Sequence, residues 1–216
     1  MRPDDPHVTV EAIAFDLLTA LLDSWTLWNR AAGNDVDGRR WRNEYLRMTY
    51  AAGDYRAYDS LVRESAAVAG VRSGAADRLF EGWGTMEPWP EVPDVLASLG
   101  LSYRIAVVTN CSSVLAERAV HCLGVTPHVI VAAERAGAYK PDPRPYRLAL
   151  SELRAPAERV LFVAGSPFDI PGAGGVGMPV AWHNRLRLAR PAGVAAPRYE
   201  LATLDALQRL VRDPAT

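Results

Sequence analysis

The stretch AIAFDLLTALLD, residues 12–23, begins as a run of apolar residues and then places a carboxylate at Asp16. The segment VEAIAF, residues 10–15, is mostly apolar and ends at a polar residue, which is typical of a buried β-strand. Two leucines follow Asp16 directly, so the acid has no polar neighbour in the sequence. An aspartate at such a strand end is either a turn former or a reactive group, and only other segments of the chain distinguish the two.

The overall composition is that of an ordinary globular protein. The 216 residues carry a formal net charge of −1, which provides no basic surface for nucleic acid or an anionic membrane. No apolar run approaches the roughly 20 residues that span a bilayer. The cysteines, Cys111 and Cys122, lack the spacing of a disulfide framework or a zinc site. The beginning, MRPDDPHVTV, is too acidic for a secretory signal, so we expect a cytoplasmic protein.

Short strands and helices alternate along most of the chain. Four more β-rich apolar runs end at polar or glycine residues, at 103–110, 128–134, 159–165 and 179–184. Helical patterns lie between them, one beginning at Asp142 and Pro143 and another ending at Gly124. This alternation predicts an α/β fold in which helices cover both faces of a parallel sheet.

One interval breaks the alternation. Residues 24–88 contain no convincing strand, carry helical faces and hold four of the six tryptophans. An all-helical insertion after the first strand predicts a cap, residues 23–88, above a core made of residues 1–22 and 89–216. The alternative, extra helices packed on a face of the sheet, stays open at this point.

Polar side chains follow most of the predicted strands at the point where each strand ends. In open parallel sheets, ligands bind beyond the carboxyl ends of the strands. The groups expected at this edge are Asp16, Thr109, Asn110, Lys140, Ser166 and Asp169. Any one of them alone is better explained as a cap or turn former, but turn chemistry does not explain the whole set in this order.

The order Asp16, Thr109, Lys140, Asp169 resembles the haloacid dehalogenase superfamily, Asp-nucleophile hydrolases with a Rossmann-like core, and most of all the L-2-haloacid dehalogenases. Their motifs FDxYGTLxD and WRxxxLxYT are similar to FDLLTALLD, residues 15–23, and WRNEYLRMTY, residues 41–50. Their motifs YKPxxxxY and FVSSNxWDxxGA are similar to YKPDPRPY, residues 139–146, and FVAGSPFDIPGA, residues 162–173. The resemblance therefore covers nearly the whole chain.

The resemblance implies hydrolysis of a carbon–halogen bond in a small organic acid through an aspartyl ester. Asp16 would be the nucleophile, Lys140 would keep it ionised, and Asp169 would position or deprotonate the water. Arg42 would reach down from the cap and receive the halide. Further substrate contacts are implied at Thr109, Asn110, Leu17, Tyr146 and Ser166. The resemblance implies no cofactor, and it leaves open a homodimer in which the cap tryptophans form the interface.

Two positions argue against a phosphatase of the same superfamily. Those enzymes carry a second aspartate two residues after the nucleophile and an acid in GDxxxD that binds magnesium. Leu18 and Gly165 stand at these places. Because phosphoryl transfer relies on a cation that offsets the phosphate charge, we expect neither magnesium nor phosphatase activity.

Several supporting residues depart from the dehalogenase pattern. Thr19 and Ala20 replace Gly-Thr, so the hydroxyl that steadies Asp16 is displaced or missing; Ala164 replaces a serine and Ser166 an asparagine. Losing such groups costs orders of magnitude in rate. Three hypotheses therefore stay open: a dehalogenase, a diverged enzyme of the same fold acting on another electrophile such as a specialised metabolite, and a binding protein that kept the pocket without turnover.

Overall fold

The computed structural model describes residues 8–212, so most of the N-terminal segment discussed above lies outside the described residues. A six-stranded parallel sheet with the order β4-β3-β2-β5-β6-β7 forms its centre. The strands are β2 (Ala12–Asp16), β3 (Arg104–Thr109), β4 (Val129–Ala132), β5 (Val160–Ala164), β6 (Val180–His183) and β7 (Tyr199–Leu201). β1 (Val8–Thr9) and β8 (Val211–Arg212) form a separate parallel pair. The predicted parallel α/β sheet is confirmed.

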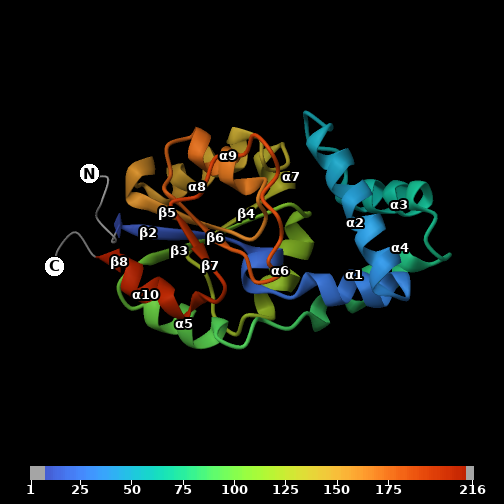
Figure 1. Ribbon diagram of the computed structural model, residues 1–216, viewed down its shortest axis with the longest axis horizontal. Helices are drawn as coiled ribbons and strands as arrows, with labels where there is room; N and C mark the ends of the chain where they lie inside the picture. Colours follow the sequence, from blue (N-terminus) through green and yellow to red (C-terminus); the bar gives the residue numbers. More distant parts are fainter. Residues whose placement is uncertain (1–7, 213–216) are drawn as a thin grey trace.

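Helices cover both faces of the sheet (Figure 1). On one face lie α8 (Pro143–Leu153) and α9 (Asp169–Gly175), and on the other lie α5 (Val92–Leu99), α6 (Ser113–His121) and α10 (Leu207–Leu210). The two-residue period of a strand separates the two cores. Along β2, Ala12 and Ala14 belong to the first core, whereas Ile13 and Phe15 belong to the second.

Several predicted boundaries were wrong by a few residues. The first strand begins at Ala12 rather than residue 10 and includes Asp16. The run 128–134 leaves the sheet after Ala132 because α7 (Ala133–Ala136) begins there. α6 ends with Cys122 as its C-cap, and Gly124, at φ 67°, belongs to the following turn. α8 begins as predicted, since the Asp142 side chain accepts a hydrogen bond from the backbone N–H of Arg144.

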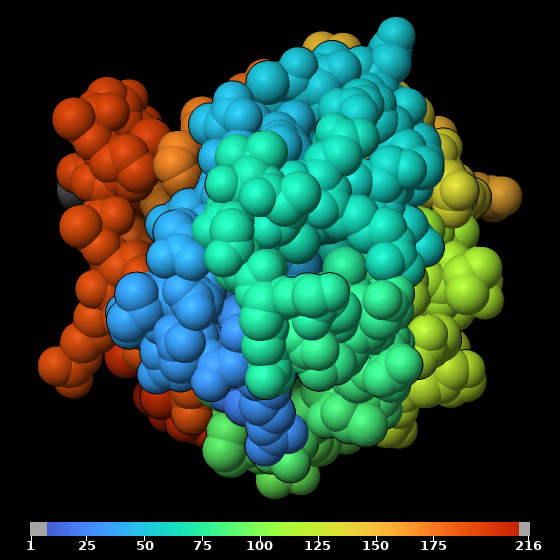
Figure 2. Space-filling view, turned by 90° about the vertical axis from the view of Figure 1, so that its right-hand side faces the viewer, coloured from blue at the N-terminus to red at the C-terminus, as the bar shows by residue number. Residues whose placement is uncertain are grey.

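The helical insertion forms a cap. Helices α1 (Ser24–Ala32), α2 (Asp35–Tyr50), α3 (Tyr58–Ala69) and α4 (Ala75–Glu81), followed by the short 3-10 helix η2 (Gly82–Thr85), lie beyond the end toward which β2 runs (Figure 1). Seen from that side, they cover much of the molecule (Figure 2). The insertion therefore does not pack on a sheet face as the alternative had it. No helix within residues 8–212 is both long and apolar enough to cross a membrane.

Aromatic side chains fill the interior of the cap. Trp28 lies with its ring centroid 4.6 Å from Trp41 and 5.3 Å from Tyr45. Tyr58 lies 5.5 Å from Tyr45 and 5.6 Å from Trp83. Such pairs stabilise a fold by about 0.5–1.5 kcal/mol each beyond their burial. Because Trp28, Trp41 and Trp83 are at most 2% exposed, these three tryptophans form the core of the cap rather than its surface.

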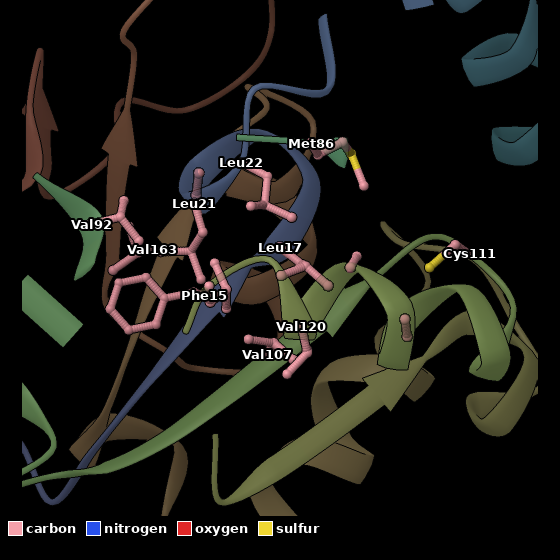
Figure 3. Packing of buried hydrophobic residues seen from close by; sticks show 14 of the residues in the cluster. Phe15, Leu17, Leu21, Leu22, Met86, Val92, Val107, Cys111, Val120 and Val163 are labelled. Carbon is pink, nitrogen blue, oxygen red and sulfur yellow. The ribbon is translucent and has the colours of Figure 1, made fainter. Parts of the chain in front are cut away.

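A single π-helical turn, η1 (Leu17–Leu21), connects β2 to the cap. Its side chains Leu17 and Leu21 are fully buried in the same core as Phe15, Val107 and Val163 (Figure 3). The turn is closed by the backbone N–H of Leu22, which donates to the carbonyl of Leu17 at 3.1 Å. Leu17 and Leu21 thus anchor the turn in the core, and the backbone N–H groups of Thr19 and Ala20 face the aspartate.

Candidate active site

The two carboxylate oxygens of Asp16 have different surroundings. Oδ2 accepts three hydrogen bonds from the turn: from Thr19 N at 2.8 Å, Thr19 Oγ1 at 2.6 Å and Ala20 N at 3.1 Å. Oδ1 accepts one, from Lys140 Nζ at 2.7 Å. The turn therefore fixes one oxygen in place, and the other is oriented by a single cation.

The hydroxyl expected to be displaced or missing is displaced by one position and still reaches Asp16. Thr19 takes the place of a glycine in the dehalogenase pattern. Gly165, at the end of β5, leaves room for it: a Cβ built there would lie 2.2 Å from Thr19 Oγ1 and 2.6 Å from Asp16 Oδ2. Contacts under 3.0 Å are not tolerated, so Thr19 occupies space that exists only because residue 165 is a glycine.

Lys140 joins the two acids of the site. It is the only lysine in the chain. Its Nζ lies 3.2 Å from Asp169 Oδ1 and 3.4 Å from Oδ2, in addition to its bond with Asp16. Asn110 holds its backbone on both sides, accepting from Lys140 N at 2.7 Å and donating to Lys140 O at 3.0 Å. Below the site, the Tyr146 hydroxyl donates to Asp169 Oδ1 at 3.0 Å.

The environment pushes the pKa values of the two acids apart. Burial alone raises the pKa of Asp16, but the charge of Lys140 and hydrogen bonds from Lys140 and Thr19 hold it below the ordinary value. Burial raises the pKa of Asp169 above its ordinary value, with Lys140 opposing and Asp16 adding to the rise. Burial lowers the pKa of Lys140, yet the two acids raise it overall. The site therefore holds an ionised Asp16 beside a more basic carboxylate at Asp169.

Arg42 approaches the same space from α2 of the cap. Asp16, Lys140, Asp169 and Arg42 are at most 8% exposed. The Arg42 guanidinium lies 3.8 Å from the ring centroid of Trp25 and donates to Ser24 Oγ at 3.4 Å. It forms no ion pair with a carboxylate of the described residues. Burial lowers the pKa of Arg42, but a guanidinium stays charged. A buried cation without a carboxylate partner favours binding of an anion.

A cavity of about 50 Å³ lies between cap and core. Six of the predicted residues line it: Asp16, Arg42, Asn110, Lys140, Ser166 and Asp169. The remaining walls include aromatic side chains of the cap and Leu18 of the turn. The volume suits a molecule of only a few heavy atoms.

Three predicted residues lie outside the cavity wall. Thr109 is fully buried, and its Oγ1 lies 3.6 Å from Cys111 Sγ. Leu17 points into the hydrophobic core, because the first residue of the tight turn faces away from the site. Tyr146 lies beneath Asp169, where it contacts an acid of the site rather than the cavity.

Several cap residues that line the cavity were not among the predicted site residues. Tyr45, Leu46 and Tyr50 follow Arg42 on α2 at spacings of three, four and eight residues. Residues at these spacings share one face of a helix, so counting from Arg42 could have found them. Tyr45 also joins the cap to the core, since its hydroxyl donates to the carbonyl of Asn110 at 2.7 Å.

The chain is similar to known dehalogenases over almost its whole length. Haloacetate dehalogenase H-2 of Moraxella sp. (strain B) is 27% identical over 219 residues, covering 94% of this chain and 98% of the relative. (S)-2-haloacid dehalogenase H-109 of Pseudomonas putida is 27% identical over 221 residues, covering 94% of this chain and 99% of the relative.

A solved structure has the same fold. L-2-haloacid dehalogenase from Xanthobacter autotrophicus, with chloropropionic acid covalently bound, matches with a TM-score of 0.82 and 21% identity over 93% of this chain and 98% of that one. The family described as haloacid dehalogenase-like hydrolase matches residues 10–177, which include Asp16, Lys140 and Asp169. The chain therefore belongs to the haloacid dehalogenase-like hydrolases.

Proposed function

We propose that this protein is a metal-independent 2-haloacid dehalogenase, which replaces the halogen of a small 2-halo acid by a hydroxyl group. One observation carries the proposal: a buried, ionised Asp16 faces a small cavity into which a second buried cation, Arg42, also reaches. Residues 23–88 act as the cap that brings Arg42 over the core. The names of the relatives support the same substrate class.

In the first step, Asp16 Oδ1 attacks the carbon that bears the halogen. The new oxygen–carbon bond forms as the carbon–halogen bond breaks, and the halide leaves with the bonding electron pair. Lys140 keeps Asp16 ionised and aims Oδ1, the oxygen that the turn leaves free. Arg42 stabilises the departing charge, because a fixed cation aimed at developing charge lowers the barrier. Asn110 and Ser166 contact the bound acid.

In the second step, water attacks Cγ of the Asp16 ester. Asp169 accepts a proton from this water, and its raised pKa makes it a suitable base. The Cγ–Oδ1 bond then breaks, and the leaving alkoxide takes the proton from Asp169 to give the 2-hydroxy acid. The regenerated carboxyl group of Asp16 releases its proton to solvent. Oδ2 bears the negative charge of the intermediate and faces the donors of the turn.

We also propose that no magnesium takes part. The place of the magnesium-binding acid of the related phosphatases is Gly165, where any side chain would collide with Thr19 and Asp16. The second aspartate of those enzymes, which protonates the leaving oxygen, is Leu18, whose side chain has no proton to give. These residues therefore fit neither the ion nor the phosphatase reaction. The near-neutral charge supports a small molecule as partner, without nucleic acid or membrane, and the cysteine pattern supports the cytoplasm as its location.

The cavity weighs against the hypothesis of a larger metabolite as substrate. About 50 Å³ leaves room for no more than a small acid, and cap aromatics close the space on the far side. A larger substrate would require the cap to move away from Asn110, which Tyr45 contacts. The size of the cavity thus supports the dehalogenase proposal over the diverged enzyme.

The test is halide release from chloroacetate and from both enantiomers of 2-chloro- and 2-bromopropionate, in EDTA. We expect release from chloroacetate and from one enantiomer, and none from the Asp16→Asn variant. A parallel reaction with an aryl phosphate and magnesium should give no product. Turnover by Asp16→Asn, or a wild-type protein that releases no halide from any of these acids, would contradict the proposal.

A further inference from the structure

Two side chains outside the reacting set hold the η1 turn from behind, through its carbonyl groups. Trp89 Nε1 donates to the carbonyl of Thr19 at 3.1 Å. His183 Nδ1, at the end of β6, lies 2.8 Å from the carbonyl of Ala20. A carbonyl oxygen only accepts hydrogen bonds, so Nδ1 carries the proton. Both partners lie far from the turn in the sequence, and His183 is fully enclosed.

One peptide unit connects the hydrogen bond from Trp89 with a hydrogen bond to Asp16. The carbonyl of Thr19 and the N–H of Ala20 belong to the same peptide, which accepts from Trp89 on one side and donates to Asp16 Oδ2 on the other. Hydrogen bonds in series polarise one another, so the indole strengthens the donor that faces the carboxylate. His183 holds the carbonyl of the next residue, Ala20, and so fixes the turn beside that donor rather than through it.

A compact polar cluster packs against these two side chains. Arg185 lies over the Trp89 ring, 4.7 Å from its centroid, and its Nη1 pairs with both oxygens of Glu91 at 2.7 and 2.9 Å. Glu91 Oε1 also accepts from Leu204 N at 3.1 Å. It lies 3.7 Å from His183 Nε2, which carries no proton in this tautomer and has no hydrogen-bond partner among the described residues. Burial lowers the pKa of His183, which keeps the ring neutral at pH 7. Neither Trp89 nor His183 lines the cavity.

We propose that Trp89 and His183 are positioning residues for hydrolysis of the Asp16 ester. The inference rests on the proposed function. In the first step, the attack on the carbon that bears the halogen, Oδ2 loses negative charge. The hydrogen-bond donors of the turn that contact Oδ2 therefore stabilise the starting carboxylate more than the transition state. In the hydrolysis step Oδ2 gains charge, and the same donors stabilise the transition state. Weakening the turn should therefore slow the second step and spare the first.

The variants separate the hydrogen bonds from packing. Trp89→Phe keeps a ring beneath Arg185 and removes only the N–H donor. His183→Leu removes the imidazole donor, and His183→Asn restores an N–H near the position of Nδ1. Trp182→Phe is the control for the loss of an indole: Trp182 is buried next to His183, and its Nε1 has no hydrogen-bond partner among the described residues.

The readout follows the two steps separately with 2-bromopropionate. Rapid quenching measures the first equivalent of halide, intact-protein mass measures the ester, and steady-state halide release measures turnover. We expect Trp89→Phe and His183→Leu to lower turnover about tenfold or more, to keep a halide burst at the wild-type rate and to accumulate ester. His183→Asn should recover most of the turnover, and Trp182→Phe should match the wild type.

The outcomes distinguish this inference from the proposed function. A wild-type protein without halide release would overturn the function itself. A wild-type protein that turns over, with both steps falling equally in Trp89→Phe or with no loss beyond that of Trp182→Phe, would overturn only the positioning roles. If His183→Leu fails to fold in a thermal unfolding check, Trp89→Phe and His183→Asn still decide the question.

Discussion

The hydroxyl of Thr19 occupies the space that a side chain at Gly165 would fill. An added Cβ would lie 2.2 Å from Thr19 Oγ1, and 2.6 Å from the Asp16 oxygen that this hydroxyl contacts. Thr19 lies in the η1 turn that follows β2, and Gly165 directly follows β5, which pairs with β2 in the sheet. Threonine and glycine at this contact form a matched pair, and changing one without the other should disturb the nucleophile.

Substituting Gly165 by alanine should therefore abolish most of the activity. The methyl group displaces the Thr19 hydroxyl and tilts Asp16, and losing a donor of this kind costs about 100-fold or more in rate. Gly174→Ala is the control, because a Cβ there meets nothing within 4 Å. The measurement is steady-state halide release. Wild-type rates in Gly165→Ala would show that the turn adapts without cost.

Replacing Lys140 by methionine should destabilise the folded protein and abolish its activity. The change leaves two buried acids without their cation, and removing one partner of a buried ion pair costs about 3–5 kcal/mol. Urea unfolding at pH 7 measures the free energy. The loss of unfolding free energy should be smaller in acid, where the two carboxylates take up protons. A loss that stays constant from pH 7 to pH 4 would argue against an electrostatic origin.

The two chemical steps should have different acid limits. The first needs ionised Asp16, whose pKa is held below its ordinary value of 3.8, whereas the second needs ionised Asp169, whose pKa is raised above it. As the pH falls, turnover should fail first, while the halide burst persists and ester accumulates. Quenched-flow measurements from pH 7 to pH 3 follow both. Coinciding limits for burst and turnover would contradict the assignment of the two acids.

The same pKa shifts fix the sign of the pH dependence of stability. Asp16, with its lowered pKa, stabilises the folded state above pH 3.8, and this contribution is lost as the pH falls through its folded pKa. Asp169, with its raised pKa, contributes stability below pH 3.8 that is lost as the pH rises through its folded pKa. As the pH rises through the folded pKa of Asp169, the free energy of unfolding of Asp169→Asn should therefore fall less than that of the wild type. An identical pH profile for both proteins would exclude the raised pKa.

Weakening the contact between Arg42 and the Trp25 ring should slow the first step, whereas Trp89→Phe should slow the second. Trp25→Ala removes the ring beneath the guanidinium, and a desolvated cation–π contact contributes about 1–2 kcal/mol, or roughly 5- to 30-fold in rate. The halide burst should slow, because Arg42 acts on the departing halide, and ester should not accumulate. Trp25→Phe should be milder. A normal burst with slow turnover in Trp25→Ala would remove Arg42 from the first step.

Much of the site followed from the sequence because it depends on strand ends. Asp16, Lys140 and Asp169 converge because parallel strands end at one edge, and short apolar runs reveal those ends. Strand β7 was not predicted, because its three residues, YEL, are too few to show the two-residue hydrophobic period of a strand. The orientation of Leu17 and Leu18 could not be predicted, since a π-helical turn follows neither the two-residue nor the 3.6-residue pattern. The contacts of Trp89 and His183 depend on tertiary packing that has no local signature.

The position of β2 in the sheet has a consequence for synthesis of the chain. β2 is made before the other strands of the six-stranded sheet, yet it lies between β3 and β5, and the nearer of these in sequence begins at Arg104. At about 5–20 residues per second, the ribosome needs roughly 4–18 s to supply it. During this wait the cap helices, whose contacts are local, are already complete. The apolar strand that ends at Asp16 has no sheet partner during this time, so it is open to association with other unfolded chains.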